Sequence, residues 1–292
     1  MRNLLISYAK AVCLTGLLLL AGCSDKDKDK AKQQPVPFIN QDRFGRYDSI
    51  GNLGGKPVSI PGGVVLHWVR YIGDPGDFDA SRKAQKYKRP PITYQLPIES
   101  FGFMYRLTDG AVLSKKEKTD IDFMHDNKTL IPRGEPFPWG HTIVYNLYKT
   151  SMPTDFNKAF EENLQLTRKI DKFEYFEQSE KKYGLTYFKA NNGIDPFTNQ
   201  PWQDDISSPD IFIYKNLKGK IKTYIQCDCI GQVQFCKHRF YLKSLPILIY
   251  ISYNRNYLSF WEQTEKNIDY ILNSWVVSND GRLIKKQAGK FN

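Results

Sequence analysis

The feature that most restricts the fold is an alternation of side chains in the second half of the chain. Apolar or small residues, together with His238, occupy every second position in segments 220–227 and 236–243. Successive side chains of a β-strand point to opposite faces, so each segment predicts a strand with one face in the core and one in solvent. A turn at 216–219 joins the first of these strands to another at 210–214, which predicts an antiparallel hairpin.

Further strands are expected at 64–71, 98–107, 142–148 and 247–251, and the last is apolar on both faces, as in the interior of a sheet. Helical spacing after Asp155 and after Ser259 predicts two helices that pack one face onto the sheet. Ser259 and Glu262 have the spacing of a capping box, and 114–125 predicts a shorter helix. The sequence thus predicts an α+β protein with a mostly antiparallel sheet and a few packed helices.

The two strand–helix segments are similar to each other. A shift of 104 residues places 143–148 on 247–252 without a gap, and it places Phe156 on Phe260. A duplicated unit would explain this similarity and would give two related β-α halves. Chance is an equal alternative, because strand–helix junctions resemble one another.

The N-terminus predicts export. Residues 1–22 combine Arg2 and Lys10 with a run of ten apolar or small residues, too short for the roughly 20 that cross a hydrocarbon core. Leu20-Ala21-Gly22-Cys23 resembles the lipobox of bacterial lipoproteins, which implies cleavage before Cys23 and acylation, such as palmitoylation, of that cysteine. A transmembrane anchor or an ordinary secretion signal is the alternative. Because Ser24 follows in place of Asp, we expect attachment to the periplasmic leaflet of the outer membrane.

Composition divides the mature chain. Residues 23–37 alternate charges without apolar side chains, so they predict a flexible tether. We expect an N-terminal β-rich part at 38–150, a C-terminal antiparallel part with flanking helices at 151–278, and a basic tail at 279–292.

Without Arg2 and Lys10, the chain has 40 basic and 31 acidic side chains and a net charge of +9. This charge suits an anionic membrane or an acidic protein, and no nucleic-acid-binding motif accompanies it.

One turn-rich loop concentrates the basic charge. It runs over 74–89, and its cations are Arg82, Lys83, Lys86, Lys88 and Arg89. A solvated loop is the default interpretation, and contact with an acidic partner is the functional one, since clustered cations speed the encounter of opposite charges.

Three cysteines remain once Cys13 leaves with the signal peptide and Cys23 is acylated, namely Cys227, Cys229 and Cys236. Cys227 and Cys236 both fall on core-facing positions of adjacent strands, so we expect a disulfide between them in an oxidising compartment. Cys229 competes for the same partner or remains a free thiol.

A zinc site is the alternative, because Cys227, Cys229, Cys236 and His238 supply four suitable ligands. The compartment and the single-residue spacing favour the disulfide, so we expect no metal or other cofactor. The chain also has no nucleophile elbow, no zinc-protease pair of histidines and no phosphate-binding glycine loop. We therefore expect a protein that is not an enzyme.

Several blocks resemble a family of periplasmic lipoproteins, the immunity proteins to type VI secretion lipase effectors. The blocks are 48–58, 100–103, 183–186, 193–196, 210–214, 219–225 and 236–238. The resemblance implies a membrane-tethered protein that binds and neutralises a cognate secreted effector, a lipase-type toxin. Cys229 and the spacing to Cys236 depart from the family's pattern. The competing class is a structural or assembly lipoprotein of the cell envelope.

Overall fold

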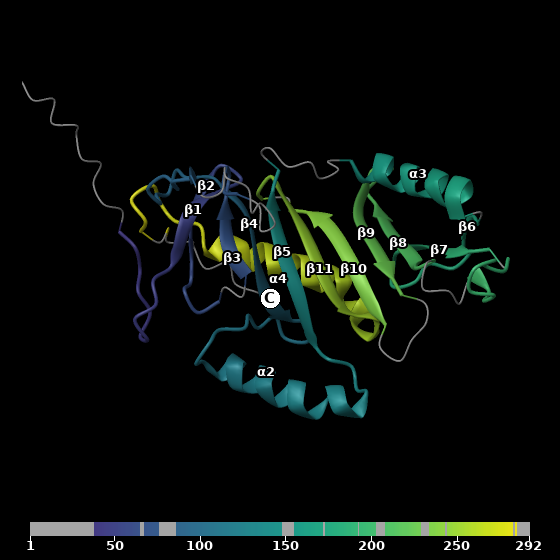
Figure 1. The fold of residues 1–292 in the computed structure, drawn as a ribbon, viewed down its shortest axis with the longest axis horizontal. Helices are drawn as coiled ribbons and strands as arrows, with labels where there is room; N and C mark the ends of the chain where they lie inside the picture. Colours follow the sequence, from purple (N-terminus) through teal and green to yellow (C-terminus); the bar gives the residue numbers. More distant parts are fainter. Residues whose placement is uncertain are drawn as a thin grey trace, which may run out of the picture. The chain divides into compact units, whose positions relative to one another are not determined.

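A nine-stranded antiparallel sheet organises the protein (Figure 1). The computed structural model describes residues 38–64, 67–75, 86–147, 155–171, 173–191, 193–202, 208–228, 234–242, 244–282 and 284. The strand order is β3-β4-β5-β11-β10-β9-β8-β7-β6. The strands are β3 (His67–Tyr71), β4 (Ile98–Arg106), β5 (Trp139–Asn146), β6 (Tyr175–Glu177), β7 (Thr186–Ala190), β8 (Asp210–Lys215), β9 (Ile221–Cys227), β10 (Phe235–Tyr241) and β11 (Ile247–Asn254).

A smaller sheet and three helices complete the described fold. The small sheet pairs β1 (Ser49–Leu53) with β2 (Lys56–Ile60). The helices are α2 (Lys118–Thr129), α3 (Phe156–Leu166) and α4 (Trp261–Ser274). Shorter helical turns are Ile131–Arg133, Thr167–Asp171 and Arg255–Phe260. Among the described residues, no helix is long and apolar enough to cross a membrane.

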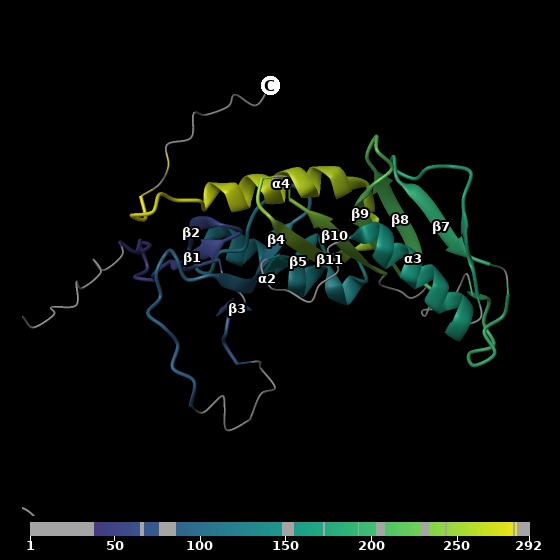
Figure 2. The ribbon, with the colours of Figure 1, turned by 90° about the horizontal axis from the view of Figure 1, so that it is seen from above.

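Helices α3 and α4 pack on opposite faces of the large sheet (Figure 2). The apolar stripe of α4, including Ile268 and Leu272, packs with Phe212 and Phe240 in the main core. Phe156 and Phe160 of α3 pack on the other face against strand residues such as Ile211 of β8. Alternation along each strand therefore serves two cores, one under each helix.

The strands predicted from alternation are confirmed, but the expected solvent face of 220–227 is wrong at Tyr224, which α3 buries through Phe156 and Phe160. Hairpin β8–β9 follows the predicted segments, and β11 lies in the interior of the sheet between β5 and β10. The two helices predicted to pack on the sheet are also confirmed as α3 and α4, and the third predicted helix, α2, begins later than expected, at Lys118. The α+β class is confirmed, and the sheet runs through both 38–150 and 151–278 because β5 pairs with β11.

The predicted capping box before α4 is wrong. Ser259 lies inside the turn Arg255–Phe260, and α4 begins only at Trp261, without a side-chain cap. Asn254 begins the turn instead, since its side chain accepts a hydrogen bond from the Asn256 amide. Buried Leu258 fixes the turn against the core.

The two strand–helix segments that resemble each other have neighbouring strands, but their helices lie on opposite faces of the sheet. β5 and β11 pair antiparallel, with Ile247 opposite Asn146. The helices that follow them, α3 and α4, lie on opposite faces. A duplication of the unit remains a prediction.

Candidate interaction surface

One face of the large sheet is covered unevenly. α4 covers the face that carries Phe103, Ile249 and Phe240. On the opposite face, α3 packs over β8 and β9 and reaches Tyr241. At the other end, α2 contacts this face where β5 begins and β4 ends, because Phe123 packs on Trp139 and Asp122 pairs with Arg106. No described helix packs over residues 100–104 of β4 and 141–143 of β5. We call this uncovered region the open face, and it is turned toward the reader in Figure 1, with α4 behind the sheet.

Strand register arranges the open face in rows that cross β4, β5, β11, β10 and β9. One row is Gly102, Ile143, Tyr250, Arg239 and Tyr224, and the next is Met104, His141, Ser252, Lys237 and Gln226. Solvent-facing sheet positions are usually polar. Here Ile143, Tyr145 and Tyr250 are half-buried, so the open face offers an apolar and aromatic surface beside two cations.

Arg239 holds a defined position on this face. Its guanidinium carbon lies 5.5 Å from the ring centroid of Tyr224 and 5.9 Å from that of Tyr250. Its terminal nitrogen donates to Gln226 Oε1 at 3.1 Å. Burial raises the pKa of the Tyr250 hydroxyl, whereas the charge of Arg239 acts in the opposite direction. The guanidinium is thus placed between two aromatic side chains that restrict its movement.

A pocket of about 470 Å³ opens where the face meets β3. The side chains at its sheet side include His141, Ile143 and Tyr145, and its outer wall includes Asp74 and Arg89. Asp74 and Arg89 are the two ends of the predicted basic loop. The structure therefore brings the base of that loop to the edge of the open face, which the sequence did not indicate.

A buried carboxylate holds the two ends of the loop together. The Asp74 side chain is 5% exposed, and it accepts hydrogen bonds from Arg89 Nε at 3.0 Å, Arg89 Nη2 at 2.8 Å, the Tyr87 hydroxyl at 2.9 Å and the Tyr71 amide at 2.9 Å. Burial alone would raise the pKa of Asp74, but hydrogen bonds from Arg89, Tyr71 and Tyr87 outweigh it and hold the pKa below its ordinary value of 3.8.

The predicted loop cations therefore differ in role. Arg89 pairs with Asp74 and stabilises the base of the loop. Lys86 and Lys88 are exposed. Arg82 and Lys83 lie outside the described residues, so their contact with a partner remains a prediction.

Asp74→Asn should reveal the contribution of this pair through its pH dependence. A carboxylate whose pKa is lowered by folding stabilises the protein above its unfolded pKa, and the contribution is lost as pH falls through the folded value. We expect the variant to be less stable than the wild type by about 1–2 kcal/mol at pH 7, with the difference shrinking below pH about 4. Urea unfolding at pH 7 and pH 3 measures this. Equal differences at the two pH values would contradict the assignment.

The structure contains the expected disulfide between Cys227 and Cys236, which are paired residues of β9 and β10. Both cysteines are fully buried. The bridge uses two of the four ligands of the alternative zinc set, and Cys229 lies outside the described residues. Within the described part of the chain, no group of three or more His, Cys, Asp and Glu side chains is placed to bind a metal.

Removing the disulfide should weaken the junction of β9 and β10. We expect Cys227→Ala combined with Cys236→Ala to lower the free energy of unfolding by roughly 2–3 kcal/mol on the chain-entropy account. Urea unfolding under non-reducing conditions measures the loss, with Cys229→Ser as the control. A loss as large in the Cys229 variant would indicate that the bridge uses a different pair.

His238 belongs to a buried polar network under α4. Its Nε2 lies 3.0 Å from Glu265 Oε1, and its Nδ1 lies 3.4 Å from the Tyr253 hydroxyl. The Thr223 hydroxyl donates to the same Glu265 oxygen at 2.7 Å. His238 and Thr223 are fully buried, so the network links β9, β10 and α4 inside the core. Sequence reasoning missed Glu265, although its place beside Thr264 in the apolar stripe of α4 could have indicated it.

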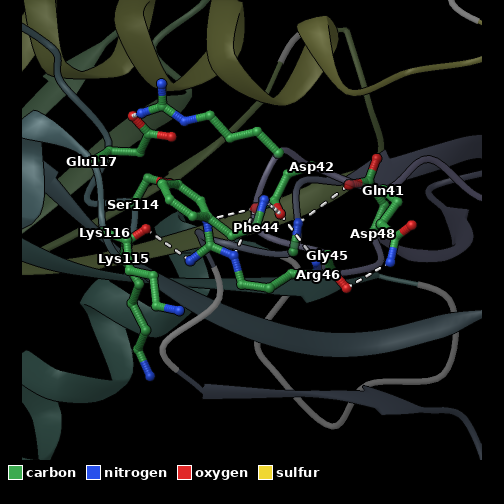
Figure 3. A network of polar contacts seen from close by, with 12 residues as sticks. Gln41, Asp42, Phe44, Gly45, Arg46, Asp48, Ser114, Lys115, Lys116 and Glu117 are labelled. Atoms are coloured by element: carbon green, nitrogen blue, oxygen red, sulfur yellow. Dashed lines mark hydrogen bonds and ion pairs between the residues drawn. The ribbon is translucent and has the colours of Figure 1, made fainter.

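A second polar network fixes the start of the folded body (Figure 3). Arg46 Nε donates to Asp42 Oδ2 at 2.6 Å, and Arg46 Nη1 donates to the Lys115 carbonyl at 2.7 Å. Arg43 pairs with Glu117 at 2.5 Å. The Phe44 ring lies 4.8 Å from the guanidinium of Arg43 and 5.0 Å from that of Arg46. Segment 42–46 is therefore attached to the loop that precedes α2.

The fold and the open face define an α+β protein with an aromatic and basic surface on one side of its sheet. Neither a comparison with protein-family models nor one with curated proteins finds a match. Among solved structures, an immunity protein of the Stenotrophomonas maltophilia type IV secretion system is similar, at 13% sequence identity and a TM-score of 0.47. The alignment covers 83% of this chain and 100% of that chain.

Proposed function

We propose that this protein is an immunity protein that binds and neutralises a secreted lipase-type toxin. The observation that carries the proposal is the open face. It is an aromatic and basic surface, and α4 packs on the opposite side of the same sheet. A stoichiometric inhibitor works by occupying part of its target, and a surface held rigid before binding lowers the entropic cost of association. The sequence blocks shared with immunity lipoproteins support the same function.

We also propose a location on the periplasmic leaflet of the outer membrane. Cys23 and the tether lie outside the described residues, and the lipobox-like sequence Leu20-Ala21-Gly22-Cys23 supports acylation. A tether concentrates the inhibitor near the membrane that a lipase attacks.

Cys23→Ala tests the anchor. We expect the variant either to appear in the soluble periplasmic fraction or to remain an uncleaved precursor without lipid label, because no residue remains to be acylated. Fractionation with metabolic labelling by a palmitate analogue measures this, and Ser24→Ala serves as the control. A variant that still carries label in the membrane fraction would disprove acylation at Cys23.

Binding to the toxin encoded by a neighbouring gene tests the function. We expect the Cys23→Ala protein to form a one-to-one complex and to suppress hydrolysis of phospholipid vesicles by that toxin. Calorimetry and a fatty-acid release assay measure the two effects. No complex at micromolar concentration, or a complex that leaves the toxin active, would overturn the proposal. The envelope-structure alternative would then be preferred.

A further inference from the structure

We infer that the open face recognises a carboxylate-bearing segment of a protein partner, with Arg239 as the principal anion contact and Lys237 beside it. The identity of the partner as the toxin rests on the proposed function, whereas the chemistry of recognition rests on the face itself. Arg239 and Lys237 project from alternate positions of β10 onto this face.

Arg239 is prepared for a planar anion. The rings of Tyr224 and Tyr250 restrict the guanidinium, and Gln226 accepts from only one of its terminal nitrogens. A guanidinium has five N–H donors in a fixed fork, which fits both oxygens of a carboxylate. Since neighbouring aromatic side chains exclude part of the water, such a bidentate bond is stronger here than in open solvent.

Other charged side chains near this face form ion pairs or hydrogen bonds of their own. Arg70 pairs with Glu99, and Arg89 pairs with Asp74. Asp228, at the β9 end of the face, accepts a hydrogen bond from the Phe235 amide at 3.2 Å. No described carboxylate forms an ion pair with Lys237 or Arg239. With Lys237 and Arg239 against Asp228, the described part of the face keeps a net positive charge for a partner.

The apolar neighbours define the rest of the partner segment. Ile143, Tyr250 and Arg239 lie opposite one another on three consecutive strands. Strands are about 4.8 Å apart, so the apolar contact and the cation are roughly 10 Å apart. A segment in the polyproline II conformation rises about 3.1 Å per residue with three residues per turn, so it would present an acidic residue and an apolar residue three positions apart on the same side.

A protein fits these features better than a lipid surface does. Membrane binding through charge uses several exposed cations, each contributing to attraction by anionic headgroups. The open face instead has one restrained guanidinium, one exposed lysine and a platform of half-buried aromatic and aliphatic side chains. Arginine and tyrosine are the residue types enriched among the strongest contacts of protein interfaces.

The first test compares variants for binding to the toxin encoded nearby. We expect Arg239→Ala to weaken binding roughly 30-fold or more. Arg239→Lys should restore little, because it keeps the charge but loses the fork. Lys266→Ala, on α4 behind the sheet, is the matched control and should bind like the wild type. Urea unfolding of each variant separates loss of the contact from loss of the fold.

The second test does not depend on the toxin. The peptide acetyl-Glu-Ala-Ala-Leu-amide is titrated into the Cys23→Ala protein while the Arg239 Nε–H and Tyr250 ring signals are followed by NMR. We expect saturable shifts at millimolar peptide and none with the Gln-Ala-Ala-Leu counterpart. Vesicles of phosphatidylglycerol should leave these signals unchanged.

The two tests fail in different ways. If wild-type protein binds the toxin but Arg239→Ala binds equally well, the inference is overturned and the proposed function stands. If the toxin is not bound but the glutamate peptide shifts Arg239, the proposed function fails and the recognition chemistry stands. Vesicle shifts at Arg239, or no response to the glutamate peptide, would overturn the inference.

Discussion

Glu265→Ala is expected to lower the free energy of unfolding by about 3 kcal/mol, because it removes one acceptor that serves two buried groups. His238 and Thr223 are fully buried, and both contact Glu265 Oε1. Without the carboxylate, His238 Nε2 and the Thr223 hydroxyl would each lose this partner inside the core. Urea unfolding with a fluorescence readout measures the loss.

Glu262 provides a matched control on the same helix. Its side chain is 63% exposed and pairs with Lys266 near the surface, so Glu262→Ala should change stability by less than about 1 kcal/mol. Glu265→Gln keeps one acceptor oxygen and should fall between the two alanine variants. If Glu265→Ala were no more destabilising than Glu262→Ala, the network would not stabilise the fold.

Phe156→Ala is expected to lower the free energy of unfolding by about 3–5 kcal/mol, as truncation of a buried phenylalanine usually does. Phe156 is 2% exposed, and its ring is stacked on Tyr241 with centroids 4.3 Å apart. It is the first residue of α3, so its loss should loosen the helix from the sheet. Urea unfolding measures the stability, and hydrogen exchange measures protection of the α3 amides.

Leu166 lies at the other end of α3 and is 52% exposed, so Leu166→Ala serves as the control with an expected change below about 1 kcal/mol. The amides of β5 should exchange as in the wild type, because β5 lies between β4 and β11. Unchanged protection of α3 in Phe156→Ala would show that the other contacts of the helix suffice to hold it.

The sequence predicted the elements whose side chains alternate or repeat regularly. The stripe of α4 carries that pattern because one side of the helix is buried and the other is not. Segment 220–227 carries it as well, although α3 buries Tyr224 on its second side. Sequence alone could not show which part of a sheet face the helices leave uncovered. That depends on α3, which reaches β8 and β9 from a distant part of the chain.

The candidate surface was harder to predict for the same reason. Alternation placed Lys237 and Arg239 on the solvent side of their strand, but Tyr224 and Tyr250 come from two other strands. Only the register brings these rings beside Arg239. For the basic loop, the clustered charge predicted a contact surface. The structure shows that one of its cations, Arg89, instead pairs with the buried carboxylate of Asp74.

The pairing of β5 with β11 also constrains how the chain acquires this structure. Asn146 and Ile247 meet across roughly a hundred intervening residues, so the entropy of closing that loop opposes the contact until much else has formed. Strands β3 to β5 are joined in sequence and can associate earlier. Until β11 pairs with β5, the side of β5 that will bind β11 exposes unpaired backbone groups, and another chain could add a strand there. Assembly of the central pair is therefore the step at which folding competes with aggregation.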